Sequence, residues 1–312
     1  MKHFKPLLAA LLLAVLLPGC AVAQAQQQPQ DGRLRIVASL FPQYDFARQI
    51  AGDYAQVELL LPPGVESHSF EPTPADMIRI HQADLFLYTG RYMEPWAQQI
   101  IDGLEGDTQV VDVSEGIQLD QEDHDHGEHG HEDHDHGGFD PHIWTSPVNA
   151  KQMVENIVQA LMEADPAHAQ TYRANADAYQ AQLDSLDAQF REIVANGNRR
   201  EIVFGGRFAL HYFAKEYGLS YLAAFDSCSH ESEPSARTVA RIVDEVEFKG
   251  IPVIYYEELV DPKVARVLAE ETGAVPLLLH SCHNLSRDEL AAGETYLTLM
   301  EQNAQNLKEG LN

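Results

Sequence analysis

The chain has 312 residues, 45% of them hydrophobic, and its 48 acidic residues far outnumber its 21 basic ones. The formal charge of −27 excludes nucleic acid and anionic membrane surfaces as natural partners and favours a cationic ligand. Once a short leader is set aside, the length is enough for two lobes of roughly 120–140 residues each.

The N-terminus has the form of an export signal. A basic start is followed by an unbroken apolar run, Leu7–Leu17, which is too short for a transmembrane helix. Cys20 directly follows Leu-Pro-Gly, which resembles the lipobox of bacterial lipoproteins. We therefore expect residues 1–20 to be a lipoprotein signal peptide, Cys20 to carry the lipid anchor and residues 21–30 to be a tether. Cleavage of an ordinary signal after Ala23 is the alternative.

Strands and helices alternate along residues 31–163, which we expect to form an N-terminal metal-binding lobe. Short apolar runs predict strands, helical periodicity predicts the segments between them, and this alternation implies parallel sheets. The predicted strands are 34–40, 57–61, 85–88 and 110–113, and the predicted helices are 42–51, 74–81, 94–104 and 147–162.

Residues 197–312 repeat this alternation and are expected to form a C-terminal lobe. Between the lobes, in segment 164–196, apolar residues recur at spacings of four and three, which predicts one long helix. We expect a rigid strut packed across both lobes, with a free coiled coil as the alternative. The expected fold class is α/β, with two lobes that each hold a mostly parallel sheet flanked by helices. Strands are predicted at 201–204, 221–225, 251–255 and 275–279, and helices at 208–217, 235–248, 262–272 and 294–308.

Six of the fifteen histidines lie in the loop 120–138, interleaved with carboxylates and glycines. Such a stretch cannot build an apolar core, so we expect a solvated loop. Neutral imidazole is a preferred nitrogen ligand of zinc, so the tract predicts weak metal capture. A plain acidic linker is the alternative. The six are His124, His126, His129, His131, His134 and His136.

Three further histidines lie at predicted strand ends or loop ends, where open α/β sheets bind their ligands. His68 follows the second strand in a loop rich in proline and glycine, His142 precedes a helix, and His280 ends the last apolar run. Alone, each suits an ordinary hydrogen-bonded role. Together with the tract they predict a metal site, with His283 close enough to replace His280. Nitrogen ligands favour Zn²⁺ over Mn²⁺, which more often takes oxygen.

At these motifs the chain resembles the solute-binding lipoproteins of metal ABC transporters, the ZnuA and TroA type. Segment 63–74, PGVESHSFEPTP, resembles the family's first-ligand loop, and segment 140–147, DPHIWTSP, resembles its second-ligand motif. The resemblance implies two lobes joined by a long helix, metal held between them, and delivery to a membrane permease.

Two positions depart from the family pattern. Arg207 stands where the family usually has its third histidine, and arginine cannot bind zinc. His211, one helical turn on, is either a ligand or a surface residue, and Arg207 instead could hold a carboxylate that closes the site. His280 falls where the family often has a ligating aspartate. The acidic candidates for a fourth ligand are Glu66 and Glu257.

Export would place the cysteines in an oxidising compartment. After Cys20 only Cys228 and Cys282 remain, so we expect a disulfide between them, with thiolate ligation of a soft metal as the alternative.

The sequence therefore predicts an exported receptor, periplasmic or on the cell surface, that binds zinc as the transported ligand and delivers it to an ABC permease. A manganese receptor of the same family and a cell-surface metal buffer or adhesin are the alternatives. No HExxH or comparable pair is present, so we do not expect an enzyme. We expect a monomer whose membrane contact is through the lipid anchor only.

Overall fold

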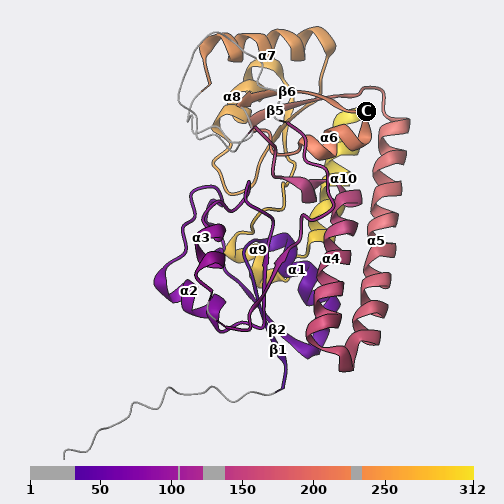
Figure 1. The fold of residues 1–312 in the computed structure, drawn as a ribbon. Coiled ribbons are helices and arrows are strands. Elements are labelled where there is room, and N and C mark those ends of the chain that lie inside the picture. The colour runs from indigo at the N-terminus through magenta and orange to yellow at the C-terminus, as the bar shows by residue number, and fades with distance from the viewer. Residues whose placement is uncertain (1–31, 105, 122–137, 226–233) are drawn as a thin grey trace, which may run out of the picture. The chain divides into compact units, whose positions relative to one another are not determined.

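The computed structural model describes residues 32–104, 106–121, 138–225 and 234–312 (Figure 1). Residues Arg33–Asn312 form one compact unit, whose fold is given below. Cys20, Cys228 and the six histidines of the tract lie outside the described residues. Within the described ranges, no helix combines the length and the apolar character needed to cross a membrane.

The first lobe is built on a parallel sheet of four strands in the order β2-β1-β3-β4. The order changes direction between β1 and β3, and ligands of such sheets bind beyond the strand ends at that point. The strands are β1 (Leu34–Ala38), β2 (Ala55–Leu59), β3 (Leu85–Tyr88) and β4 (Gln109–Asp112), and the helices are α1 (Phe41–Ala51), α2 (Pro74–His81), α3 (Ala97–Asp102) and α4 (Pro147–Ala164).

Capping residues set where the helices of this lobe begin. Thr73 and Asp76 form a reciprocal capping box at the start of α2, and Ser146 caps α4. In both helices a proline occupies the first turn, where its missing N–H has no partner to lose.

The second lobe has the same topology, with a parallel sheet in the order β6-β5-β7-β8. The pairing of β5 with β6 shifts in register between Phe204 and Arg207, which distorts the carboxyl end of β5. The strands are β5 (Glu201–Arg207), β6 (Ser220–Phe225), β7 (Val253–Tyr256) and β8 (Val275–Leu278), and the helices are α6 (His211–Tyr217), α7 (Ala236–Lys249) and α8 (Lys263–Thr272).

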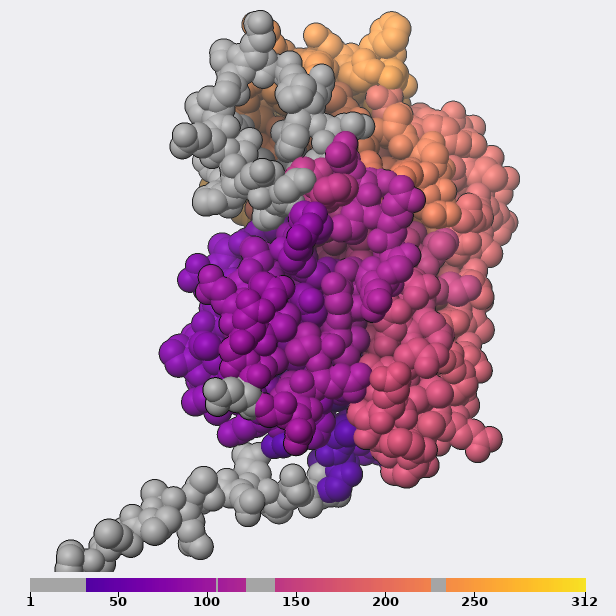
Figure 2. Space-filling model, in the orientation of Figure 1, coloured from indigo at the N-terminus to yellow at the C-terminus, as the bar shows by residue number. Residues whose placement is uncertain are grey.

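Helix α5 (Ala169–Asn196, 28 residues) packs against both lobes. It contacts α1 and α4 of the first lobe, α6 of the second, and α10 (Tyr296–Leu311), which itself packs on the second sheet. In Figure 2 the residues of α4 and α5, in the magenta to salmon part of the colour range, lie side by side on one side of the molecule. One hydrophobic core contains residues of both sheets and both long helices. The prediction of a strut packed across the two lobes is therefore confirmed. Its buried stripe is Tyr172, Ala176, Tyr179, Leu183, Leu186, Phe190 and Val194.

The chain after β8 leaves the second sheet and is hydrogen-bonded to the first lobe. The Gly64 N–H donates to the Leu285 carbonyl over 2.7 Å, and the Tyr296 N–H donates to Asp45 Oδ2 over 2.9 Å. The same segment holds the short helix α9 (Arg287–Ala292), which begins at a capping box on Ser286 and which periodicity did not predict because it has only six residues.

Candidate metal-binding site

Two of the predicted histidines meet at the carboxyl side of the first sheet. The distance between His68 Nε2 and His142 Nε2 is 3.1 Å. Two tetrahedral zinc ligands at ordinary Zn–N lengths lie about 3.3 Å apart. The pair is therefore spaced to bind one ion with both Nε2 atoms.

His142 is held by a buried carboxylate. Asp140 Oδ1 accepts the His142 backbone N–H over 2.8 Å and lies 2.9 Å from its Nδ1. Burial would raise the pKa of Asp140, but its interactions with His142 outweigh burial and lower it, so the group stays ionised. A carboxylate on Nδ1 fixes the proton there and leaves the Nε2 lone pair for a metal. The Tyr212 hydroxyl donates to the Asp140 carbonyl and steadies this segment.

His68 is positioned by its own loop. Glu66 Oε1 accepts the His68 N–H over 3.1 Å, and Glu66 Oε2 accepts the Ser69 N–H over 3.0 Å. Gly64 takes a φ of +83°, which an L side chain would strain, and so turns the loop. Both carboxylate oxygens of Glu66, which was predicted as a possible ligand, thus accept hydrogen bonds from backbone N–H groups of this loop.

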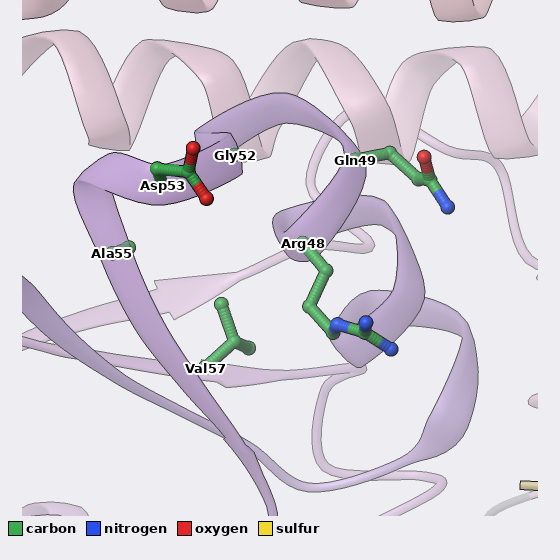
Figure 3. A pocket seen from close by; sticks show the side chains of 6 residues that line it. All are labelled: Arg48, Gln49, Gly52, Asp53, Ala55 and Val57. Carbon is green, nitrogen blue, oxygen red and sulfur yellow. The ribbon is translucent and has the colours of Figure 1, made fainter. Parts of the chain in front are cut away.

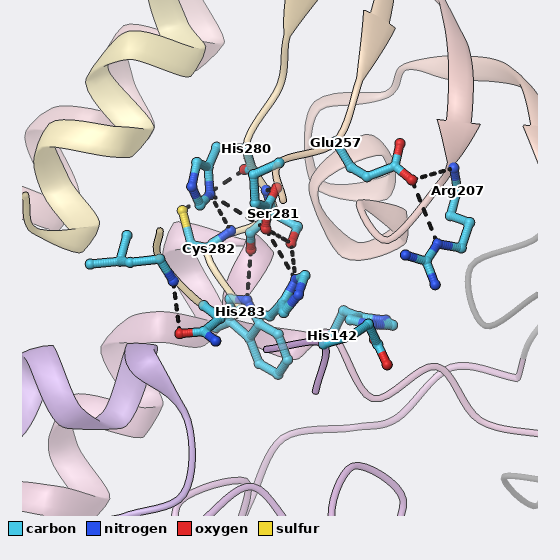
Figure 4. A network of polar contacts seen from close by, with 12 residues as sticks. His142, Arg207, Glu257, His280, Ser281, Cys282 and His283 are labelled. Carbon is cyan, nitrogen blue, oxygen red and sulfur yellow. Dashed lines mark hydrogen bonds and ion pairs between the residues drawn. The ribbon is translucent and has the colours of Figure 1, made fainter. Parts of the chain in front are cut away.

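His280, predicted as the third ligand, does not join this pair. Its Nδ1 accepts the Cys282 N–H over 2.8 Å, and its Nε2 lies 3.8 Å from Glu289 of α9. Asn303 of α10 binds both the N–H and the carbonyl of His280. In Figure 4 its ring points away from His142. Among the described residues His280 is therefore not joined to the histidine pair. Its backbone ties the end of β8 to α10, and its buried Nε2 has no hydrogen-bond partner there.

His283 is the substitute for His280 that the sequence offered. Its Nδ1 lies 3.1 Å from Glu258 Oε1 and 2.6 Å from Ser281 Oγ, and its side chain is 13% exposed. This repeats the arrangement of Asp140 and His142, with the carboxylate on Nδ1 and Nε2 left for a metal. Burial alone would lower the pKa of His283, but Glu258 and Glu66 raise it. Burial would likewise raise the pKa of Glu258, yet His280 and His283 hold it well below its usual range.

Hydrogen bonds join the segments that carry His68 and His283. Asn284 Nδ2 donates to the carbonyls of Pro62 and Val65, over 2.9 and 2.8 Å. The chain reverses at Cys282, a non-glycine residue with a φ of +63°, so that His280 and His283 face different surroundings. No signal in the sequence marks that reversal. The one usable hint was the proximity of His283 to His280.

The remaining candidates lie elsewhere or are engaged. His211 Nε2 is 3.2 Å from Asp120 Oδ2, in a cluster with Lys215, and its charge also acts on Asp140, the carboxylate beside His142. Glu257 is bound to Arg207. Cys282 is a free, fully buried cysteine, which runs against the expected disulfide, although Cys228 lies outside the described residues.

The described residues contain no ready-made cluster of three or more metal-ligating side chains. A polar cavity of about 250 Å³ lies beside α1 and β2 (Figure 3). It adjoins Ala55, at the amino end of β2, which is the wrong end of the sheet for a ligand site. The histidine pair therefore remains the best-supported site.

Comparison with known proteins shows the family of the chain. Residues 36–310 match the profile of the family described as zinc-uptake complex component A, periplasmic, or ZnuA. The chain belongs to the ZnuA family. It is 36% identical to the zinc-binding lipoprotein AdcA of Streptococcus pneumoniae, over 96% of this chain and 60% of AdcA. It is also 36% identical to the high-affinity zinc uptake system protein ZnuA of Bacillus subtilis, over 97% of this chain and 96% of that protein.

Solved structures show the same fold. The Zn(II)-bound ZnuA-like domain of S. pneumoniae AdcA matches with a TM-score of 0.76 and 33% identity, over 90% of this chain and 99% of that domain. The metal-dependent lipoprotein YcdH of B. subtilis matches with a TM-score of 0.77 and 34% identity, over 89% and 99% of the two chains. The predicted resemblance and fold class are confirmed, although this chain spans only 60% of the length of AdcA.

Proposed function

We propose that this ZnuA-family chain is the extracytoplasmic zinc receptor of an uptake system, which binds the ion as cargo and delivers it to an ABC permease. The observation that carries the proposal is the 3.1 Å between His68 Nε2 and His142 Nε2. The zinc-binding role of AdcA and the zinc-uptake role of B. subtilis ZnuA support it. The formal charge of −27 favours approach of a cation.

The proposed ligands are the Nε2 atoms of His68, His142 and His283. Two of these rings have a buried carboxylate at Nδ1, the outer support that zinc-binding histidines usually have. Three imidazoles favour zinc over manganese. Zinc binding would require the segments joined by Asn284 to bring the ring of His283 to the ion.

The lipid anchor, the tether and the histidine tract complete the proposal. Acylation of Cys20 would tether the receptor to a membrane, and residues 21–30 would separate it from the lipid. The histidine tract, from His124 to His136, would capture zinc weakly and raise its supply near the site. All of these residues lie outside the described part of the chain.

Zinc titration of the full mature chain against a chelator of nanomolar affinity tests the ligand set, because weak binding by the tract then goes uncounted. His68→Ala, His142→Ala and His283→Ala should each weaken zinc binding at least about 100-fold, beyond the usual effect of removing an outer-shell partner. His280→Asn keeps an acceptor for the Cys282 N–H. This variant should bind zinc as tightly as the parent does, and so should His81→Ala, at an exposed position.

Two results would overturn the proposal. The proposed ligand set would be refuted if His280→Asn lost tight zinc binding while His283→Ala kept it. Normal growth at low zinc of cells that lack this gene would refute the uptake role.

A further inference from the structure

A second charged pair lies at the carboxyl ends of β5 and β7, the two neighbouring central strands of the second sheet. Arg207 is the last residue of β5, and Glu257 directly follows β7. Glu257 Oε1 accepts the Arg207 backbone N–H over 3.2 Å and lies 3.5 Å from Arg207 Nε. Figure 4 shows the two side chains meeting at the strand ends. The carboxylate is thus bound twice by one residue of β5.

Gly206 makes room for this carboxylate. A Cβ atom at position 206 would stand 1.7 Å from Glu257 Oε2, so any other residue would push the carboxylate away. Oε2 is buried and has no hydrogen-bond partner among the described residues. The glutamate therefore lies flat against the β5 backbone, in the space that a side chain at position 206 would fill.

The pair lies next to the residue that holds the proposed ligand His283. Glu258 directly follows Glu257 in the chain, and its Oε1 lies 3.1 Å from His283 Nδ1 (Figure 4). Arginine remains charged and has no acceptor atom, so it repels a dication and cannot bind one. Glu257, by contrast, is a hard oxygen donor that would suit Mn²⁺ if it could reach the ion.

We propose that Arg207 and Gly206 hold Glu257 out of the metal's coordination shell, and that this restraint makes Arg207 the residue that sets the preference for zinc over manganese. The inference rests on the proposed function, because it assumes that His68, His142 and His283 bind the ion. While Glu257 is held back, the side chains that bind the ion offer only histidine nitrogens. The positive charge of Arg207 also remains near the ion. Both effects act against an oxygen-seeking dication more than against zinc.

The test measures dissociation constants for Zn²⁺ and Mn²⁺ on the full mature chain, each by competition with a chelator, and follows their ratio. Arg207→Met keeps a long unbranched side chain and the backbone N–H bond to Glu257 Oε1, and it removes the guanidinium charge that lies 3.5 Å from that oxygen. We expect both ions to bind more tightly and the Mn²⁺-to-Zn²⁺ ratio of dissociation constants to fall about tenfold. In Arg207→Met with Glu257→Gln, which keeps the side-chain shape, the ratio should return to within about threefold of the parent.

Each remaining outcome is decisive. An unchanged ratio in Arg207→Met, in a protein that still binds zinc tightly, would overturn the inference and leave the proposed function standing. A raised ratio in Glu257→Gln alone would show that the carboxylate already binds metal in the parent, and this too would overturn it. Failure of the parent chain to bind zinc would instead refute the proposed function. Thermal unfolding of each variant confirms that it is folded.

Discussion

Trp144 Nε1 donates a buried hydrogen bond of 2.8 Å to the carbonyl of Ser281, although 137 positions separate the two residues. Trp144 lies two residues after His142, and Ser281 lies two before His283. The bond thus joins the segments of two proposed ligands. Asn284 makes the equivalent link to the loop of His68. The segments of all three histidines are therefore linked to one another. The second lobe contributes Glu258, which lies 3.1 Å from His283 Nδ1, together with Arg207 and Glu257.

Asn284→Ala should weaken zinc binding about tenfold, because the loop of His68 loses two side-chain donors and no longer stays in register with His283. Asn156→Ala is a matched control, since Asn156 Nδ2 also donates to two backbone carbonyls, those of Val113 and Glu115. Both changes should lower the free energy of unfolding by about 1–3 kcal/mol. Only the first should change the zinc dissociation constant, measured by chelator competition. Equal zinc affinities would contradict this role of Asn284.

The local pattern of apolar and polar residues was sufficient to predict most of the helices and strands. The apolar stripe from Tyr172 to Ile193 predicts α5, and it lies on one face of a single helix, although at its end Val194 is buried and Ile193 only partly so. His68 and His142 were also predictable, since both lie in loops at the carboxyl side of the first sheet. The choice between His280 and His283 was not, because it depends on the positive φ of Cys282 and on contacts with Glu258 and Asn303 that are distant in sequence.

The strut can be tested at Phe190, a fully buried residue of α5. Its ring centroid lies 4.8 Å from that of Phe213 and 5.2 Å from that of Tyr217, both in α6. Phe190→Ala should lower the free energy of unfolding by about 3–5 kcal/mol, measured by urea titration. Glu192→Ala, at an exposed position on the same helix, should change it by less than about 0.5 kcal/mol. Similar effects of the two changes would argue against the packed strut.

The ion pair between α4 and α5 should give a pH-dependent stability. Arg173 donates to Glu155 over 2.7 and 2.8 Å, and these bonds lower the pKa of Glu155 to about 2. Because this folded-state pKa lies below the unfolded value of about 4.3, the contribution is present above pH 4.3 and lost as the pH falls towards 2.

Both side chains of this pair are about one-third exposed, so solvent screens it. Glu155→Gln should cost about 0.5–1 kcal/mol at pH 7, measured by urea unfolding, and the difference from the parent should shrink below pH 4. Glu301→Gln, exposed on α10, is the control. A difference that stays constant down to pH 3 would show that charge is not its source.

The contribution of Glu94 to stability should change with pH in the opposite direction to that of Glu155. Glu94 is 1% exposed, and its carboxyl accepts the Thr89 N–H over 3.0 Å and accepts a hydrogen bond from the Ser39 hydroxyl. Burial outweighs these bonds and raises the pKa of Glu94 to about 8. The folded state therefore binds more protons than the unfolded chain between about pH 4.3 and 8, and stability falls as the pH rises through that window.

Glu94→Gln removes this ionisation and keeps the side-chain shape. We expect the variant to be more stable than the parent at pH 9, by on the order of a few kcal/mol, and close to it at pH 5. Urea unfolding at pH 5, 7 and 9 measures the difference, with Glu192→Gln as an exposed control. If the curves for Glu94→Gln and the parent run parallel from pH 5 to 9, the carboxylate is already ionised in the folded protein. Ser39 and Thr89, at the ends of β1 and β3, would then stabilise a buried negative charge beside the metal-binding side of the sheet.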